Sequence, residues 1–264
     1  MLKEFAKMSQ VIGKRIDYVQ GGGGNTSVKL GNGLMVIKAS GYRLSQVTES
    51  DGFAVVEIDG LKNVTKEQGY KLLRPSVEAG FHTLLDNYVL HTHPVYANLA
   101  LCSVGGVDNL PSVIDGYHCI TVPYIDPGKA LADAIKEKID EKTQVVFMRN
   151  HGLTVTADTA DECLHIHECV NNHIANEYGV TADDFQSFLR EINKILYPDQ
   201  QVYLDLSDAQ NEIMTAVMFI HFTLMKNGKK AHTMDENAMR FIAEWESEAY
   251  RKSILKKGGF YEFI

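Results

Sequence analysis

The chain has 264 residues and a mass of 29.5 kDa, which is enough for one large domain or two small ones. Hydrophobic residues make up 45% of the chain and charged residues 23%. This composition is typical of soluble globular proteins and excludes collagen, low-complexity disorder and disulfide-rich miniproteins. The formal net charge of −8 argues against binding to duplex nucleic acid, which requires a concentrated basic surface.

Signals for export, membrane insertion or a cysteine framework are weak. None of the four cysteines forms a CxxC pair, so neither a disulfide framework nor a zinc knuckle is indicated. The opening residues MLKEFAKMSQVIGKRID mix Lys and Glu with apolar residues, a pattern that predicts an amphipathic helix rather than a signal peptide. The apolar stretch Ile213–Met225 is too short to span a bilayer. We therefore expect a cytoplasmic protein with no membrane or nucleic-acid partner.

Short strands dominate the first part of the chain after the opening helix. The segment GGGGNTSVKL predicts a glycine turn followed by a strand, and further strands are expected at Leu34–Lys38 and Phe53–Ile58. Ser76 is a favourable N-cap, with Glu78 in the first turn, so a helix is expected to begin there. The β-branched and aromatic run Tyr88–His93 predicts the next strand.

The second half continues with mixed strands and helices. A strand is expected at Ile120–Tyr124 and a helix at Gly128–Glu141. Two strands, Gln144–Arg149 and Leu153–Thr156, are joined by Asn150-His151-Gly152, with Gly expected at the left-handed position of the turn. This order favours an α/β layered sheet over a helical bundle.

Helices are expected to dominate the rest of the chain. The capping box that begins at Thr159 predicts a helix reaching about Tyr178. After Pro198 the sequence predicts two helices, Ser207–Lys226 and Asp235–Lys256. We interpret them as a helical appendage rather than as an independent domain.

Three histidines and one glutamate are the strongest candidates for chemistry. His91 and His93 are two apart on a predicted strand, so their side chains share one face and can approach one ion. His151, in the turn between two strands, is the natural third imidazole, and a catalytic zinc ion typically takes three protein ligands. Glu78 would supply an acid/base or a fourth ligand. The alternative is a chance pair of histidines beside a hairpin.

A second histidine and cysteine set lies on the helix that follows the capping box. His165, Cys169 and His173 recur every four residues and share one helix face. Cysteine is more often a small buried hydrophobe, so packing is the favoured interpretation of this face. His82 is one helical turn from Glu78 and is as consistent with a supporting partner as with a ligand.

Three turns of small residues could hold an anion or a polyol. They are Gly21–Ser27, Ala39-Ser40-Gly41 and Pro75-Ser76, and each offers backbone N–H groups and hydroxyls. The glycine run lacks both the Walker signature and the GxGxxG spacing of dinucleotide-binding folds. A single turn of this kind more often only connects two secondary-structure elements.

Taken together, these residues make the chain resemble the class II aldolase/adducin family from about Phe5 to Tyr178, closest to the modules of rhamnulose- and fuculose-phosphate aldolases. Six motifs occur in order, and together they are far more specific than any one alone. They are GGGNTSVK (Gly22–Lys29), KASG (Lys38–Gly41), RPSVE (Arg74–Glu78), HTHPVYA (His91–Ala97), VPYIDPG (Val122–Gly128) and NHGL (Asn150–Leu153).

The resemblance implies a fold and an assembly. The fold that it implies is three-layer α/β/α with a central, mainly antiparallel sheet, to which the sequence after Pro198 adds a C-terminal helical appendage. Residues 1–200 would form the aldolase/adducin-like domain, and residues 201–264 a helical extension packed on it. Family members are usually homotetramers.

The resemblance also assigns site residues. The zinc ligands of the family fall on His91, His93 and His151, and its catalytic acid falls on Glu78. Val77 stands where some phosphate-using members have a second serine. Tyr117 and Tyr124 are the candidates for the tyrosine that protonates the leaving group. The residues for phosphate or substrate binding fall on Asn25, Ser40, Gly41 and Ser76.

The implied activity is that of a Zn²⁺-dependent (or other divalent-metal-dependent) aldolase. It would cleave a small ketose, expected as its 1-phosphate, reversibly through a metal-bound enediolate. Glu78 would move the proton at carbon, a role that favours a carboxyl with a raised pKa. The alternatives are an epimerase, a decarboxylase or a dehydratase of sugar phosphates on the same fold, and a non-catalytic scaffold like the adducin head.

Overall fold

A single sheet of eight strands organises the protein. The structure, a computed structural model, describes residues 1–204 and 206–256. The strand order is β3-β2-β1-β4-β8-β7-β6-β5, and every neighbouring pair is antiparallel except β6 and β7. The expected central, mainly antiparallel sheet is confirmed. The strands are β1 (Asn25–Lys29), β2 (Leu34–Lys38), β3 (Phe53–Glu57), β4 (Tyr88–Thr92), β5 (Val113–Ile114), β6 (Tyr117–Val122), β7 (Thr143–Met148) and β8 (Gly152–Ala157).

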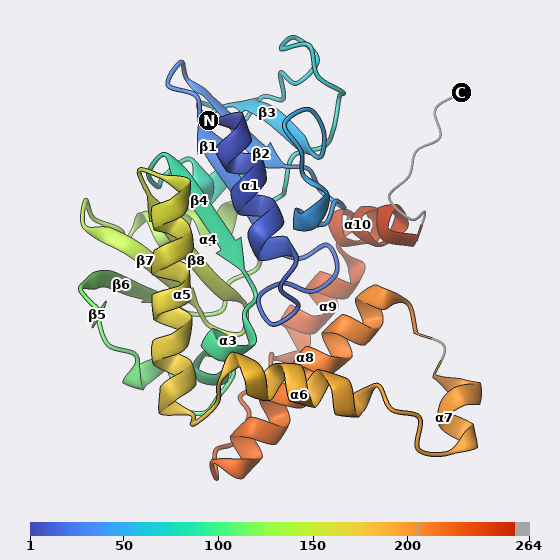
Figure 1. Cartoon of the computed structure of the whole chain (residues 1–264). Coiled ribbons are helices and arrows are strands. Elements are labelled where there is room, and N and C mark those ends of the chain that lie inside the picture. Colours follow the sequence, from blue (N-terminus) through green and yellow to red (C-terminus); the bar gives the residue numbers. More distant parts are fainter. Residues whose placement is uncertain (205, 257–264) are drawn as a thin grey trace.

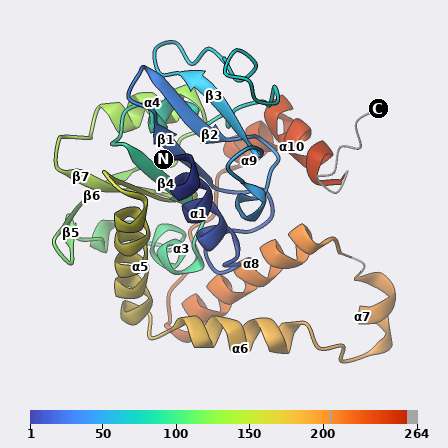
Figure 2. The ribbon, with the colours of Figure 1, turned by 45° about the horizontal axis from the view of Figure 1, so that its top comes forward.

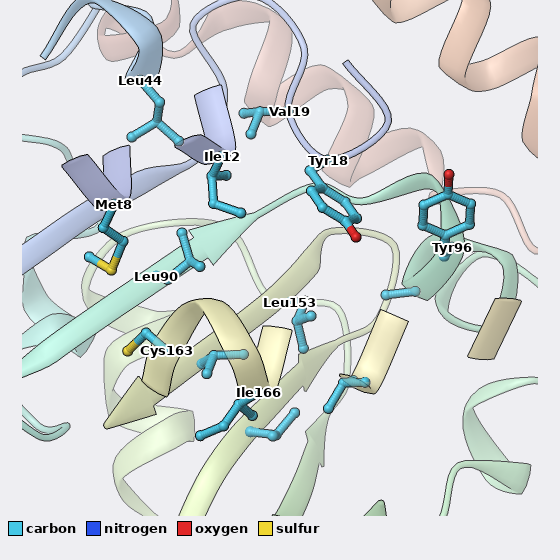
Figure 3. Close-up of a cluster of buried hydrophobic side chains, with 14 of the residues drawn as sticks. Met8, Ile12, Tyr18, Val19, Leu44, Leu90, Tyr96, Leu153, Cys163 and Ile166 are labelled. Carbon is cyan, nitrogen blue, oxygen red and sulfur yellow. The ribbon is translucent and has the colours of Figure 1, made fainter. Parts of the chain in front are cut away.

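Helices cover both faces of this sheet, which gives the three layers (Figure 1). Successive residues of a strand point to opposite faces; in β4, Leu90 packs with α1 and α5, whereas Val89 packs with α2 and α4. Figure 3 shows Met8 and Ile12 of α1 and Ile166 of α5 around Leu90. The helices are α1 (Leu2–Gly13), α2 (Ala79–His82), α3 (Val95–Leu101), α4 (Lys129–Lys136), α5 (Ala160–Glu177), α6 (Ala182–Ile192), α7 (Pro198–Tyr203), α8 (Asp208–Lys226), α9 (Glu236–Glu244) and α10 (Glu246–Lys256), with 3₁₀ turns at Leu44–Gln46 and Val107–Asn109.

Two of the predicted helix starts are confirmed by their capping contacts. The hydroxyl of Thr159 accepts a hydrogen bond from the Glu162 N–H at 3.2 Å, so α5 begins where the capping box predicts. The hydroxyl of Ser207 caps α8 in the same way. A side-chain oxygen at this position satisfies one of the backbone donors that the first turn leaves unpaired.

Several helical features differ from expectation. Helix α3 was not predicted because all seven of its residues are buried, so it has no polar face to give a helical period. Helix α6 is capped by Thr181 and was also missed. The helix expected at Asp235–Lys256 is broken at Trp245, whose backbone is extended. The break allows α10 to turn so that Glu246 and Ser247 contact Arg74.

The turn between β7 and β8 also differs from expectation. The residue with positive φ is Asn150, at 52°, and not Gly152. Asn tolerates this conformation better than most residues because its side chain forms local hydrogen bonds. Gly152 is required for another reason, since a Cβ there would overlap the carbonyl oxygen of Thr92 on the neighbouring strand.

The C-terminal helices share the core of the sheet domain. Phe219 of α8 lies 5.1 Å from Phe185 of α6 and 6.5 Å from Tyr96 of α3, measured between ring centroids. Figure 2 shows α9 and α10 returning toward the β2–β3 end of the sheet. The boundary at residue 200 stays a prediction. No helix in the described part of the chain combines the length and apolar character of a membrane span.

Candidate active site

The three candidate imidazoles converge at the carboxyl end of β4. His91 is in β4 and His93 directly follows it, while His151 reaches them from the β7–β8 turn. The Nε2 atoms of His91 and His93 are 3.2 Å apart. One ligand atom from each of the three histidines lies within 4.8 Å of the others, and the described residues contain no second such group of three.

His91 is held with a defined nitrogen toward this cluster. Its Nδ1 lies 3.0 Å from the carbonyl oxygen of Leu153 and 3.1 Å from the hydroxyl of Thr154. Because a carbonyl only accepts, Nδ1 carries the proton and Nε2 presents its lone pair to the cluster. Burial lowers the pKa of His91 to about 4, although the nearby Glu78 opposes this shift. His91 is therefore a neutral ligand-type imidazole at pH 7.

Glu78 is the carboxylate of the cluster. Its Oε2 lies 3.5 Å from His91 Nε2 and its Oε1 lies 3.1 Å from His151 Nε2. The side-chain amide of Asn25 donates to Oε2 at 2.7 Å. Burial disfavours the charged form, but the electrostatic influence of the neighbouring imidazoles, His91 first, and the hydrogen bond from His151 outweigh it and hold the pKa of Glu78 well below its usual range. The expected raised pKa is not found, and the carboxylate is in its basic form.

The helix expected from Ser76 begins three residues later, so Ser76 is not an N-cap. Its hydroxyl accepts from the Glu78 N–H at 3.3 Å within a turn, and Glu78 itself is the residue before α2. Pro75 pairs with Ala39 in an isolated bridge, and the Ser40 N–H donates to the Arg74 carbonyl at 2.8 Å. This pairing with the Ala39–Gly41 turn outweighs the local N-cap preference and brings the two turns together.

The donor set fits a zinc-type cation. Three imidazoles with one carboxylate beside them are ligand chemistry typical of catalytic zinc sites. Oε1 of Glu78 is buried without a hydrogen-bond partner among the described residues, although it lies close to an imidazole nitrogen. A buried carboxylate oxygen in this state is costly unless a cation or proton satisfies it.

A cavity of about 240 Å³ opens on this cluster. All four residues expected for phosphate or substrate binding line it, which brings together three turns distant in the chain. His91 lies behind the cavity wall and is fully buried. The lining includes Asn25, Ser40, Gly41, Ser76, Val77, Glu78, His93 and His151.

Several lining residues were not singled out from the sequence. Lys38 is buried at the end of β2 and donates to the carbonyl oxygen of Tyr42 at 2.7 Å. A lysine that ends the apolar strand LMVIK is the signal that could have revealed it. Met234, Ile242 and Ser247 come from the C-terminal helical part, and no local pattern marks them.

Of the two tyrosine candidates, one lines the cavity and the other does not. Tyr124 lines the cavity, and its hydroxyl donates to Asp126 at 3.2 Å. Burial raises the pKa of Tyr124, which keeps the phenol protonated. Tyr117 is in β6 with its ring 6.4 Å from His165, away from the cavity lining.

The rival set on α5 does not converge. The sulfur of Cys169 lies 3.6 Å from His165 Nε2, but the nearest acids to His173 are Asp115 and Glu177, at 3.9 and 3.7 Å. These residues do not form a three-ligand cluster. His82 lies outside the cavity lining, and its Nδ1 is 2.7 Å from the Ser27 hydroxyl.

Thr92, between the two strand histidines, points to the opposite face of the sheet and meets His167 of α5. The hydroxyl of Thr92 lies 2.8 Å from His167 Nε2. His167 is fully buried, and burial together with the charge of Arg15 lowers its pKa to about 3. This contact ties the strand that carries His91 to the helix layer.

The depressed pKa of His167 predicts a pH-dependent stability. Between pH 6.5 and about 3 the unfolded chain binds a proton at this residue that the folded chain does not, so stability falls as pH is lowered through this window. His167→Gln is expected to reduce the slope of unfolding free energy against pH by up to about 1.4 kcal/mol per pH unit. Urea unfolding of metal-free protein at several pH values measures this slope. His221→Gln, at an exposed position of α8, should leave it unchanged; equal slopes in all three proteins would contradict the assignment.

Comparisons with known proteins agree with this architecture. Residues 3–177 match the model of the family described as Class II Aldolase and Adducin N-terminal domain. No curated protein matches the chain. A solved N-terminal class II aldolase domain of a conserved protein from Thermoplasma acidophilum is 26% identical, with a TM-score of 0.54, covering 66% of this chain and 91% of that one.

Two further solved structures share the fold at lower identity. An L-fuculose 1-phosphate aldolase is 20% identical, with a TM-score of 0.53, covering 83% of this chain and 95% of that one. YgbL from Klebsiella pneumoniae, whose description leaves aldolase, epimerase and decarboxylase open, is 20% identical with a TM-score of 0.54, covering 66% and 86%. Because the family model spans well over half of the chain, the protein belongs to the class II aldolase and adducin family.

Proposed function

We propose that this protein is a zinc-dependent aldolase that cleaves a small ketose, in the form of its 1-phosphate, in a reversible retro-aldol reaction. The observation that carries the proposal is the placement of three imidazoles and one buried carboxylate beside the cavity that three small-residue turns line. A scaffold without activity would have no need of this donor set.

His91, His93 and His151 would hold the metal. When bound there, the ion would supply Lewis acidity that stabilises negative charge on the substrate oxygens. The amide of Asn25 and the hydroxyls of Ser40 and Ser76 would bind the polar end of the substrate and fix the direction of the bond that breaks. The substrate-binding roles rest on the common cavity that Asn25, Ser40 and Ser76 line.

Glu78 would move the proton at carbon. Retro-aldol cleavage removes a hydroxyl proton, breaks the adjacent carbon–carbon bond and leaves an electron pair on the ketone fragment, which must then gain a proton at carbon. Glu78 is ionised and held by Asn25, so its carboxylate would take the hydroxyl proton and return it to the carbon of the ketone fragment. Tyr124, which lines the cavity with its phenol protonated, is the candidate that donates a hydrogen bond to the oxygen of the leaving aldehyde.

Incubation of the zinc-loaded protein with a panel of ketose 1-phosphates tests the function. We expect release of dihydroxyacetone phosphate from at least one of them, and loss of this release after chelation. The unphosphorylated ketoses serve as the control for anion recognition. Formation of an epimer without triose release would instead favour an epimerase, and a chain that retains less than roughly a third of a metal ion after mild purification would favour a scaffold.

The expected homotetramer and cytoplasmic location stay predictions. Light scattering on the purified chain measures the first directly.

A further inference from the structure

The orientation of the His151 imidazole has less side-chain and backbone support than that of His91. The imidazole of His91 is fixed from behind by Leu153 and Thr154. In contrast, Nδ1 of His151 is buried without a hydrogen-bond partner among the described residues. The His151 ring meets Glu78 on its Nε2 side only, so on its Nδ1 side its direction depends on the backbone of the β7–β8 turn, where Asn150 adopts a positive φ of 52°.

Asn150 forms a reciprocal pair with His232, a residue between α8 and α9. Its Nδ2 donates to the His232 carbonyl oxygen at 2.7 Å, and its Oδ1 lies 2.8 Å from His232 Nδ1. The carbonyl only accepts, so it fixes which end of the Asn150 amide faces it. Oδ1 then needs a donor, which places the proton of the His232 imidazole on Nδ1.

The segment around His232 is itself anchored to the end of α3. The His232 N–H donates to the Cys102 carbonyl at 2.8 Å, and Ser103 pairs with Ala231 in a bridge. The Asn150 N–H donates to the carbonyl of Leu101, one residue before Cys102, at 3.1 Å. The turn is thus held from two sides, by the end of α3 and by the chain that follows α8.

We propose that Asn150 and His232 are positioning residues that hold the His151 imidazole in the geometry required for metal binding. The C-terminal part of the chain, which lies outside the residues matched by the family, would thereby tune a site built from the sheet. This inference rests on the proposed metal role of His151. Neither residue lies among the ligands; each acts through the turn.

Cobalt binding by the full-length chain tests the proposal, because the visible spectrum of Co²⁺ reports its coordination geometry. His232→Ala removes the donor to Asn150 and is expected to weaken Co²⁺ binding about tenfold, as loss of supporting hydrogen bonds around metal ligands does, and to change the spectrum. His232→Asn, whose amide N–H replaces the imidazole Nδ1–H, is expected to restore most of the affinity and the spectrum.

Asn227→Ala is the matched control. The Asn227 side chain also donates to backbone carbonyls, of Tyr178 at 3.0 Å and Thr223 at 2.9 Å, and ties the end of α8 to the end of α5 away from the cavity. The urea midpoint of the metal-free proteins separates lost stability from lost positioning. We expect Asn227→Ala to change the midpoint but neither the Co²⁺ affinity nor the spectrum.

The outcomes separate this inference from the proposed function. Wild-type Co²⁺ affinity and spectrum in His232→Ala, or the same loss in Asn227→Ala, would overturn the positioning role while the metal site stands. A wild-type chain that binds no Co²⁺ would overturn the metal site and, with it, this inference.

Discussion

Replacing Glu78 by glutamine is expected to abolish turnover while leaving the metal in place. The amide has nearly the shape of the carboxylate and keeps an oxygen that can accept from Asn25, which donates to Glu78 at 2.7 Å. It has no proton-accepting oxygen of comparable basicity, so transfer at the substrate carbon fails. We expect kcat to fall by about 10²- to 10⁴-fold, the range that a positioned acid/base contributes, with unchanged metal content by elemental analysis.

Glu57→Gln serves as the control, because Glu57 ends β3 and does not line the cavity. It should retain wild-type turnover and metal. Two results for Glu78→Gln would change the assignment in different ways. Unchanged turnover would remove the proton-transfer role, whereas loss of the metal would make Glu78 a ligand instead of a base.

The sequence predicted best where the signal was local. The alternation of His91, Thr92 and His93 predicted two side chains on one face, and the structure places Thr92 against α5 on the other face. The capping residue of α5 marked its start. The resemblance to the family predicted that turns far apart in the chain meet at one site. The spacing of these turns in the sequence does not reveal which of them meet.

Prediction failed where distant contacts override local preference. Ser76 has a favourable N-cap sequence, yet the pairing of Pro75 with Ala39 delays the helix to Ala79. The contact between Asn150 and His232 joins residues 82 positions apart, and no sequence pattern around either residue predicts this contact. The part of the cavity wall that the C-terminal helices supply could not be predicted for the same reason. An apolar helix face in the sequence indicates that the helix packs on another element, but it does not identify that element.

Replacing His91 by alanine is expected to remove the metal from the protein. His91 is fully buried, and its Nδ1 is already held by Leu153, so its Nε2 is the donor with the least freedom in the cluster. Loss of one of three ligands should weaken zinc binding by at least about a hundredfold, more than loss of a supporting contact. Competition with a chromogenic chelator measures this affinity.

The control for His91→Ala is His165→Ala on the rival α5 face. His165 contacts Cys169 but forms no three-ligand group, so this variant should bind zinc as the wild type does. The reverse result, with zinc retained by His91→Ala and lost by His165→Ala, would move the metal to α5. Urea unfolding of both variants without metal shows whether each still folds, because an alanine in a buried site also creates a cavity. A folded His91→Ala chain without zinc would leave Glu78 beside only two imidazoles, and the loss of its activity would then follow from the missing ligand.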